Sequence, residues 1–400
     1  MNIPVKNCSS CMACANICAR NAIEIVQDVE GFYRPQIDEE LCVKCGACER
    51  VCPWNHLITN PNSSSERPQT FAAYSNDDNI RLNSSSGGIF SVLAKTVLRE
   101  GGVVVGVGYK DPTHLEFKIV ETEAEMKDLR LSKYFQANVG LIYKTVKKLL
   151  QEGRKVLVSG TSCQVAALYA VLGKRLFENL TTIDIVCHGV PSQKVFEKYI
   201  QELESRKGKV VNTNFRDKVS GWKRFSLTNI FESEYVGICK ESKILREDTF
   251  MQAFLDNLCL NKSCMNCNYG KLPRIADITL GDYWNIAKHH PEMDDDKGTS
   301  VVLLNTDHGK DLFHTAQNAE ANALTMTVCV SQLEYAIDGN PCIVRSSHAH
   351  KNRDTFMAML NSATLPELLK KFNHPQNKTI ARIRKFLKFI KNTLEDPYAK

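Results

Sequence analysis

The sequence predicts an α/β core with a mixed, partly parallel sheet, preceded by a small cysteine-rich α+β unit and followed by a helical tail. Three observations support this prediction. Helical and extended patterns alternate from about residue 70 onward, which is typical of a parallel or mixed sheet covered by helices. Half of the 16 cysteines lie within residues 1–52, and the residues from 370 onward are strongly basic.

The composition is that of a globular chain. Of the 400 residues, 43% are hydrophobic and 24% are charged, which is enough for one large core or two smaller ones. No run reaches the roughly 18 apolar residues of a membrane helix, and residues 1–8 lack the apolar core of a secretory signal. We therefore expect a cytoplasmic protein. Thiols stay reduced there, so the 16 cysteines indicate metal or redox chemistry rather than disulfides.

The net charge of +6 is concentrated in the tail. Residues 370–400 hold nine Lys or Arg against two acidic residues, which accounts for the whole basic excess. The rest of the chain has no basic strip interleaved with aromatic residues. We therefore expect no nucleic-acid partner.

The cysteines of the N-terminal unit form an internal repeat. A C-x2-C-x2-C-x3-C run recurs 34 residues later, and Pro53 follows the second copy. Bacterial two-cluster ferredoxins carry this run, and the fourth cysteine of each copy ligates the other cluster. Two zinc sites are the alternative, but zinc motifs usually separate two CxxC pairs by a longer loop. The expected [4Fe-4S] ligand sets are Cys8, Cys11, Cys14 and Cys52 for the first cluster, and Cys42, Cys45, Cys48 and Cys18 for the second.

Between the two runs, residues 22–26 and 32–37 are expected to form a β-hairpin that covers the clusters. Residues 1–58 are therefore assigned to a ferredoxin-like α+β iron–sulfur domain, whose small core leaves much of its stability to the metal centres. The polar Ser/Pro/Asn stretch that follows indicates a linker. The remaining boundaries are the linker at 59–69, the α/β core at 70–350 and the helical tail at 351–400.

Within the core, apolar periodicity predicts alternating helices and strands. No detailed topology is predicted for residues 205–300, where the pattern is weaker. The expected helices are 88–99, 140–151, 164–172 and 193–203, and the expected strands are 103–107, 155–159 and 182–186.

Two of the expected strand-to-helix turns carry a cysteine, Cys163 in one and Cys187 in the other. If the helix between them is a normal crossover, the two strands are parallel and both cysteines emerge at the same sheet edge, where ligands of α/β proteins bind. A CxxC pair and one more thiol follow later in the chain. We expect a third [4Fe-4S] cluster held by Cys163, Cys187, Cys264 and Cys267, with Cys259 as the alternative fourth ligand. Buried core thiols with a small zinc knuckle are the simpler alternative.

A serine- and glycine-rich turn at 84–88 opens the helix expected at 88–99. Free backbone N–H groups and small side chains let a phosphate approach such a helix start. Ser-rich helix caps are also common without a ligand. No G-x-G-x-x-G follows an expected strand and no P-loop is present, so a Rossmann dinucleotide site is not predicted.

In five stretches of the core, the sequence resembles the beta-subunit family of coenzyme F420 hydrogenases and dehydrogenases, which are iron–sulfur flavoproteins. Ser162 departs from the proline found in many relatives. The resemblance implies FAD beside a [4Fe-4S] cluster in the core. The matching stretches are 85–90, 132–136, 159–164, 186–192 and 276–284. The flavin contacts that it implies are Ser86, Gly87, Gly88, Lys133, Gly160 and Thr161.

The resemblance implies an oxidoreductase that couples two-electron chemistry at FAD to one-electron transfer through [4Fe-4S] clusters, with ferredoxin or another redox protein as partner. One alternative is a non-catalytic electron-transfer subunit that serves a catalytic partner subunit. Another is an iron–sulfur scaffold protein, linked to polysaccharide biosynthesis. No catalytic acid or base is predicted, and the substrate stays open.

A few single residues are candidates for supporting roles. His188 is a candidate proton donor or hydrogen-bond partner of a cluster sulfur, and Asp277 and Asp282 are candidate strand caps or cofactor contacts. Cys239, Cys329 and Cys342 have no metal-like spacing and are expected to be core or surface thiols.

The tail is expected to contain a basic amphipathic helix. Apolar residues recur at helical spacing between Ile380 and Leu394, with basic residues largely on the other faces. Such a helix suits peripheral contact with an anionic membrane surface, or with a partner protein. The alternative is a terminal helix that packs on its own domain with a solvated basic face.

Overall fold

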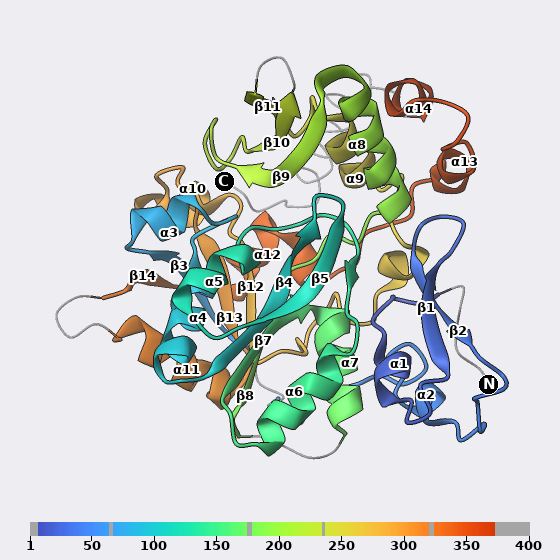
Figure 1. The fold of residues 1–400 in the computed structure, drawn as a ribbon. Coiled ribbons are helices and arrows are strands. Elements are labelled where there is room, and N and C mark those ends of the chain that lie inside the picture. The colour runs from blue at the N-terminus through green and yellow to red at the C-terminus, as the bar shows by residue number, and fades with distance from the viewer. Residues whose placement is uncertain (1–6, 64–66, 174–177, 234–236, 320–323, 373–400) are drawn as a thin grey trace, which may run out of the picture.

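A nine-stranded mixed sheet forms the centre of the molecule (Figure 1), with the strand order β14-β3-β13-β12-β8-β7-β4-β5-β6. The structure is a computed structural model that describes residues 7–63, 67–173, 178–233, 237–319 and 324–372. The predicted mixed, partly parallel sheet is confirmed. Its strands are β3 (Gln69–Ser75), β4 (Val103–Asp111), β5 (His114–Val120), β6 (Ala137–Asn138), β7 (Val156–Thr161), β8 (Leu180–Ile185), β12 (Ile278–Asp282), β13 (Ser300–Leu304) and β14 (Met326–Ser331).

Four adjacent strands at the centre of this sheet, β4, β7, β8 and β12, are parallel to one another. Strands β13, β3 and β14 extend the sheet on one side in antiparallel pairings, and β5 pairs antiparallel with β4 on the other. The parallel pairing of β7 with β8 confirms the crossover expected between them. Because the four strands are parallel, their carboxyl ends meet at one edge of the sheet, which is where ligands of open α/β sheets bind.

Helices cover both faces of the central strands. Helices α4 (Ile89–Arg99) and α11 (Asp307–Gln317) pack on one face, and α6 (Ile142–Gln151) and α7 (Ser162–Leu172) pack on the other. Successive residues of β4 point to opposite faces, so Val104 packs with the first pair of helices while Val103 and Val105 pack with the second pair. Strands buried on both faces are apolar at successive positions, and this produced their strong sequence signal.

A second, smaller sheet lies above the main one in Figure 1. It contains β9 (Lys209–Asp217), β10 (Ser226–Ser233) and β11 (Gly237–Ile244), all antiparallel, and packs with α8 (Gln193–Lys207) and α9 (Thr249–Leu255). Together these elements build a wall over the carboxyl ends of the parallel strands.

The N-terminal unit forms a separate lobe at the side of the core (Figure 1). It consists of α1 (Ala13–Ile17), the hairpin β1 (Ile23–Gln27) and β2 (Tyr33–Ile37), and α2 (Ala47–Arg50). The hairpin was predicted, and its strands begin within one residue of the expected positions. Helix α1 packs against α6 and α7 of the core.

Polar contacts also bind this lobe to the core. The guanidinium of Arg353 pairs with the Glu30 carboxylate through two N–O contacts of 2.6 Å each. The Asn261 amide nitrogen donates to the Cys8 carbonyl oxygen at 3.1 Å. Arg353 is 3% exposed, and its charge is balanced by Glu30 and by Asp354, which lies 2.9 Å from the same guanidinium.

The segments that flank the core pack closely against it. Asn60, in the expected linker, is 4% exposed and donates through its amide nitrogen to the Asp277 carboxylate at 3.3 Å. After the core, α13 (Arg353–Ala358) and α14 (Leu365–Phe372) join the apolar cluster around α9. The amphipathic helix expected between Ile380 and Leu394 lies outside the described residues.

The remaining helices are short. In the described part of the chain, no helix is long and apolar enough to cross a membrane. The short helices are α3 (Asp78–Leu82), α5 (Glu123–Met126), α10 (Ile286–His289) and α12 (Leu333–Gly339), with 3-10 turns η1 (Lys127–Leu129), η2 (Lys262–Asn266), η3 (Pro291–Met293) and η4 (Pro341–Ile343).

Candidate functional site

The first expected ligand set, Cys8, Cys11, Cys14 and Cys52, lines one cavity under the N-terminal hairpin. Burial and the neighbouring Cys11 and Cys8 thiols raise the pKa of the Cys14 thiol. Four thiolates could not share such a buried space without a cation, because each desolvated negative charge repels the others. The cavity therefore fits the expected metal centre, which removes the thiol protons when it binds.

The second set lies nearer the surface. Cys48 is buried, and burial together with the Cys42 and Cys45 thiols raises its pKa. Cys45 is exposed, and Cys42 and Cys18 are half-buried. Cys18 directly follows α1, which packs against α2, so the crossed arrangement of the fourth cysteines is compatible with the fold.

Left-handed backbone conformations recur at matching positions of the two cysteine runs. Ser10 and Met12 have φ angles of 57° and 59°, and Lys44 and Gly46, 34 residues further on, have φ angles of 55° and 72°. Only one of these four residues is glycine, so the other three adopt a conformation that costs free energy. The repeated turn wraps each run around a common centre, and it is the structural counterpart of the sequence repeat.

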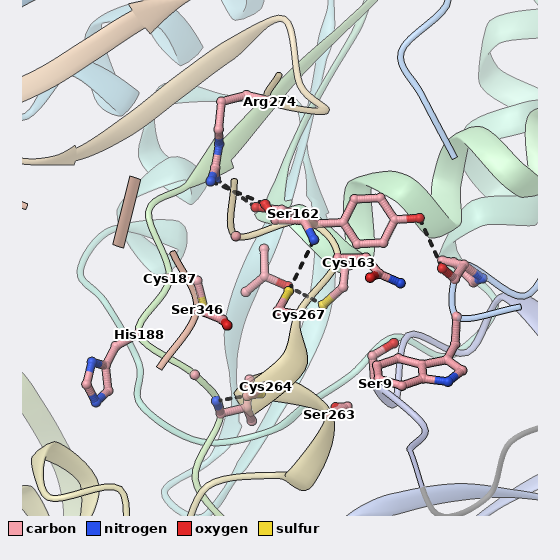
Figure 2. Close-up of a pocket in the computed structure, with 18 residues that line it drawn as sticks. Ser9, Ser162, Cys163, Cys187, His188, Ser263, Cys264, Cys267, Arg274 and Ser346 are labelled. Carbon is pink, nitrogen blue, oxygen red and sulfur yellow. Dashed lines mark hydrogen bonds between the residues drawn. The ribbon is translucent and has the colours of Figure 1, made fainter. Parts of the chain in front are cut away.

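Figure 2 shows the third set, in which Cys163, Cys187, Cys264 and Cys267 line one cavity. Cys163 stands in the first turn of α7, Cys187 follows β8, and the other two come from η2 and the residue after it. Burial, with the Cys267 and Cys187 thiols adding to it, raises the pKa of Cys163 to about 12. We call this space the core cysteine cavity.

Backbone N–H groups already point at sulfur atoms in the core cysteine cavity. The N–H of Val190 donates to Cys264 Sγ at 3.4 Å, and the N–H of Tyr269 donates to Cys267 Sγ at 3.4 Å. Such donors stabilise negative charge on a ligating sulfur and tune the potential of an iron–sulfur cluster.

Cys259, the alternative fourth ligand, lies elsewhere. It is 0% exposed and packs in the apolar cluster that contains α8 and α9. It does not line the core cysteine cavity, so the geometry favours Cys163, Cys187, Cys264 and Cys267 over any set that includes Cys259. The thiol of Cys342, expected to be a core or surface residue, lines a neighbouring cleft.

A buried ion pair supports the core cysteine cavity. The Arg274 guanidinium lies 2.7 Å from the Asp184 carboxylate, and the side chains of the two residues are 1% and 0% exposed. The same guanidinium nitrogen donates to the Ser162 hydroxyl at 2.8 Å, which in turn donates to Asp184 at 2.8 Å. Ser162 precedes Cys163, so this network holds the first turn of α7 in place.

A cleft of about 750 Å³ lies at the carboxyl ends of the four parallel strands, within the roughly 300–1,000 Å³ range of ligand pockets. Five of the six residues expected to contact flavin line it, and Gly87 does not. The five are Ser86, Gly88, Lys133, Gly160 and Thr161.

Gly87 has a structural role instead. Its N–H donates to the Ser300 hydroxyl at 2.9 Å, and a Cβ at this position would lie 2.4 Å from the Ala73 carbonyl oxygen. The Ser86 hydroxyl likewise donates to the Thr299 carbonyl at 2.8 Å. The free polar groups at this end of the cleft are therefore those of the α4 start, where Gly88 is the N-cap without a side-chain cap.

The start of α7 also differs from the prediction. The helix begins at Ser162, two residues before the expected start, and Gly160 belongs to β7. The Thr161 N–H and hydroxyl both donate to the Gln164 side-chain oxygen, at 2.8 and 3.0 Å. Thr161 is thus the N-cap residue of α7, and it contributes to the cleft mainly as wall.

Arg216, which the sequence analysis did not single out, lies in the cleft beside Asp282, which it named as a candidate. The Arg216 guanidinium pairs with both oxygens of Asp282 at 2.8 Å each, and Trp222 donates its indole N–H to the same carboxylate at 3.0 Å. Asp282 is therefore a cleft residue that positions Arg216. Asp277, by contrast, is 1% exposed and accepts from the backbone and hydroxyl of Thr182 inside the core.

His188 lies where the core cysteine cavity meets the cleft, and lines both. Its Nε2 contacts the Asn257 side-chain oxygen at 2.7 Å, and burial lowers the pKa of the imidazole. Asn257 thus holds the ring through Nε2, while Nδ1 lies 3.4 Å from the Ser347 hydroxyl.

The three spaces adjoin one another. Figure 2 places His188 and Ser9 on opposite sides of the four core cysteines. The first cysteine cavity and the core cysteine cavity share Ser9, Pro53 and Trp54, and the core cysteine cavity and the cleft share Thr161 and residues 187–190. A continuous series of sites therefore runs from the N-terminal lobe to the cleft.

Comparisons with known proteins agree with the separation of the chain into an N-terminal lobe and a core. Residues 7–56 match a family model described as a 4Fe-4S dicluster domain. Residues 70–142 and 153–327 match the models for the N-terminal and C-terminal parts of the coenzyme F420 hydrogenase/dehydrogenase beta subunit. No curated protein matches the chain.

Among solved structures, the chain is similar to a chain of the F420-reducing [NiFe] hydrogenase complex from Methanosarcina barkeri, determined with xenon derivatization. The two are 17% identical, the match covers 77% of this chain and 98% of that one, and the TM-score is 0.48. The two models of the beta subunit together cover more than half of the chain, and the C-terminal one includes all four cysteines of the core cysteine cavity. On these grounds, this iron–sulfur chain belongs to the coenzyme F420 hydrogenase/dehydrogenase beta-subunit family.

Proposed function

We propose that the chain is an iron–sulfur flavoprotein oxidoreductase with two [4Fe-4S] clusters in the N-terminal lobe, a third in the core and FAD in the cleft. The adjoining series of two cysteine cavities and a cleft supports this proposal most strongly. When bound, FAD supplies two-electron chemistry toward a substrate and one-electron exchange with a neighbouring cluster.

The cleft offers unpaired polar groups that suit a flavin. Gln136 Oε1 and Arg216 Nε are both buried and have no hydrogen-bond partner in the part of the chain that the structure describes, and both residues line the cleft. A buried polar atom without a partner costs free energy, so such atoms indicate a ligand that completes them. A flavin ring carries an N–H between two carbonyl oxygens and so offers both a donor and acceptors.

Other groups of the cleft suit the rest of the cofactor. The uncapped start of α4 presents backbone N–H groups to the cleft, an arrangement that favours phosphate. Trp284 lines the cleft and is stacked on Trp222 with ring centroids 4.7 Å apart. This rigid aromatic pair fixes one wall and excludes water from it.

Electrons are exchanged with an external redox protein at the second cluster. Cys45 is exposed there, and the neighbouring Leu41 and Val43 are 44% and 62% exposed. Exposed apolar residues beside a cluster ligand suit a transient redox partner, because such interfaces are small and need little specific pairing.

Anaerobic purification with quantification of iron, sulfide and flavin tests the proposal. We expect about twelve irons and about one flavin per chain. About eight irons with no flavin after reconstitution would refute it, and would leave an electron-transfer protein with two clusters.

Lys133 makes flavin binding depend on pH. Burial lowers the pKa of its ammonium to about 7, with Asp128 opposing and Lys118 adding to the shift. Its Nζ donates to the Arg130 and Leu131 carbonyls at 2.8 and 3.1 Å. An anionic cofactor beside Lys133 raises the pKa of its ammonium. Above a pH of about 7, binding of the cofactor must therefore be accompanied by uptake of a proton at Lys133.

We therefore expect the affinity for FAD to be constant below pH of about 7 and to fall above it, by up to about tenfold per pH unit. Fluorescence titration of flavin-free protein measures this dependence. Lys133→Met should remove it, while Lys155→Met, at a surface ion pair with Glu100, should retain it. A wild-type affinity that does not change with pH would contradict the role of Lys133.

A further inference from the structure

Three metal-ligating side chains meet at the edge of the main sheet. His290 follows α10, Glu292 lies in η3 and Cys329 stands on the edge strand β14. None of them lines the cysteine cavities or the cleft described above. This cluster could not be predicted from the sequence, because Cys329 is nearly 40 residues from His290 and lacks a second cysteine at metal spacing.

The ligand atoms are spaced as the corners of a metal tetrahedron require. Cys329 Sγ lies 3.4 Å from His290 Nδ1 and 3.7 Å from Glu292 Oε1, and His290 Nδ1 lies 3.6 Å from Glu292 Oε1. In tetrahedral zinc sites, with Zn–S of about 2.3 Å and Zn–N or Zn–O of about 2.0–2.1 Å, the corresponding edges are about 3.5 Å to sulfur and about 3.3 Å between the lighter atoms. A small closing movement of the exposed Glu292 is all that ligation needs.

The imidazole is already oriented for this role. His290 Nε2 contacts the Ser331 hydroxyl at 2.8 Å, and that hydroxyl contacts the Tyr283 hydroxyl at 2.5 Å. This chain of hydrogen bonds holds the ring with Nδ1 toward Cys329 and Glu292. Metal-bound histidines commonly have their second nitrogen fixed in this way.

We propose that His290, Glu292 and Cys329 bind a zinc ion, with the fourth position open to water. A thiolate, an imidazole and a carboxylate form a donor set that favours zinc over the harder magnesium and calcium ions. The Cys329 thiol releases its proton to solvent as the sulfur–zinc bond forms. The side chain of Glu292 is 61% exposed, so the ion can enter from solvent.

Bound zinc would tie the edge of the sheet to the segment after α10. Strand β14 lies at the end of the sheet order, and among the described residues it pairs with β3 alone. A link from Cys329 to His290 and Glu292 covers this edge, which would otherwise be open to pairing with another chain. Because zinc binds the native state, it should also raise the unfolding midpoint.

Zinc content of protein with fully loaded iron–sulfur clusters tests the site. The protein is incubated with zinc, desalted under anaerobic conditions and assayed for zinc, iron and sulfide. We expect about one tightly bound zinc per chain in the wild type, with iron and sulfide unchanged. Zinc-edge X-ray absorption should show one sulfur and otherwise nitrogen or oxygen neighbours.

Three variants locate the ion. Glu292→Gln and Cys329→Ser should lose the zinc at unchanged iron content, and the exposed Glu292 can be changed with little effect on folding. Ser331→Ala should weaken binding about tenfold through the histidine that it holds. Cys239→Ser, at a half-buried cysteine of β11, should bind zinc as the wild type does. Absence of zinc from the wild type, or equal zinc in Glu292→Gln and Cys329→Ser, would overturn the proposal.

Discussion

Replacing Cys163 with alanine should lower the iron content by about four atoms per chain and leave the two N-terminal clusters in place. The reason is that the four thiols of the core cysteine cavity come from three separate elements, and no other thiol lines that cavity. Iron and sulfide analysis with electron paramagnetic resonance of the reduced protein measures the loss. Under the proposed function, reduction of FAD by a one-electron donor should slow at the same time.

Cys342→Ala is the matched control for this experiment. Cys342 lines the cleft near Cys187 without belonging to the four-thiol set. The Cys342→Ala variant should keep the full iron content. Comparison of the two variants therefore distinguishes the loss of a cluster ligand from the loss of any nearby thiol. Full iron in Cys163→Ala, or lost iron in Cys342→Ala, would refute the ligand assignment.

Replacing Arg274 with methionine should destabilise the core by about 3–5 kcal/mol, because the Asp184 carboxylate is then buried without its ion-pair partner. The pair is almost completely shielded from solvent, so water cannot replace the lost contact. Thermal unfolding of the cluster-loaded protein measures the effect. The first turn of α7 should loosen as well, which would make the core cluster easier to extract with a chelator.

Lys148→Met provides the comparison, since Lys148 pairs with Glu152 at the surface with side-chain exposures of 76% and 52%. That variant should leave the unfolding midpoint unchanged. Equal midpoints for Arg274→Met and the wild type would show that the buried pair contributes nothing to stability.

Prediction of the fold from the sequence succeeded where burial imposes a regular pattern. The β7–α7–β8 unit is apolar on both faces of its strands and periodic in its helix, so its elements and its parallel pairing could be predicted. Strands β9–β11 could not, because they alternate polar and apolar residues irregularly and depend on packing with α8 and α9. That second sheet supplies Arg216 to the cleft.

Prediction of the site likewise succeeded for residues with a local sequence pattern and failed for residues that are brought together by the fold. The four cysteines that line the core cysteine cavity were named from local patterns, Cys264 and Cys267 from their CxxC spacing and Cys163 and Cys187 from their places after expected strands. Arg216 and Asp282 lie 66 residues apart, and a pairing at that distance leaves no mark in either neighbourhood. Gly87 does not line the cleft, and this could not be predicted, because a glycine packed against a carbonyl and a glycine beside a phosphate look alike in the sequence. Only the contact with Ala73 separates the two cases.

The N-terminal lobe is bound to the core by the ion pair of the buried Arg353 with the half-buried Glu30 and by the packing of α1 against α6 and α7. Its clusters are therefore held at constant separation from the core, unlike those of a tethered carrier that must swing into position. Electron tunnelling through the chain should then be insensitive to solvent viscosity and to the length of the segment that joins the two parts. Under the proposed function, diffusion would then limit turnover only at the encounter with a separate redox partner.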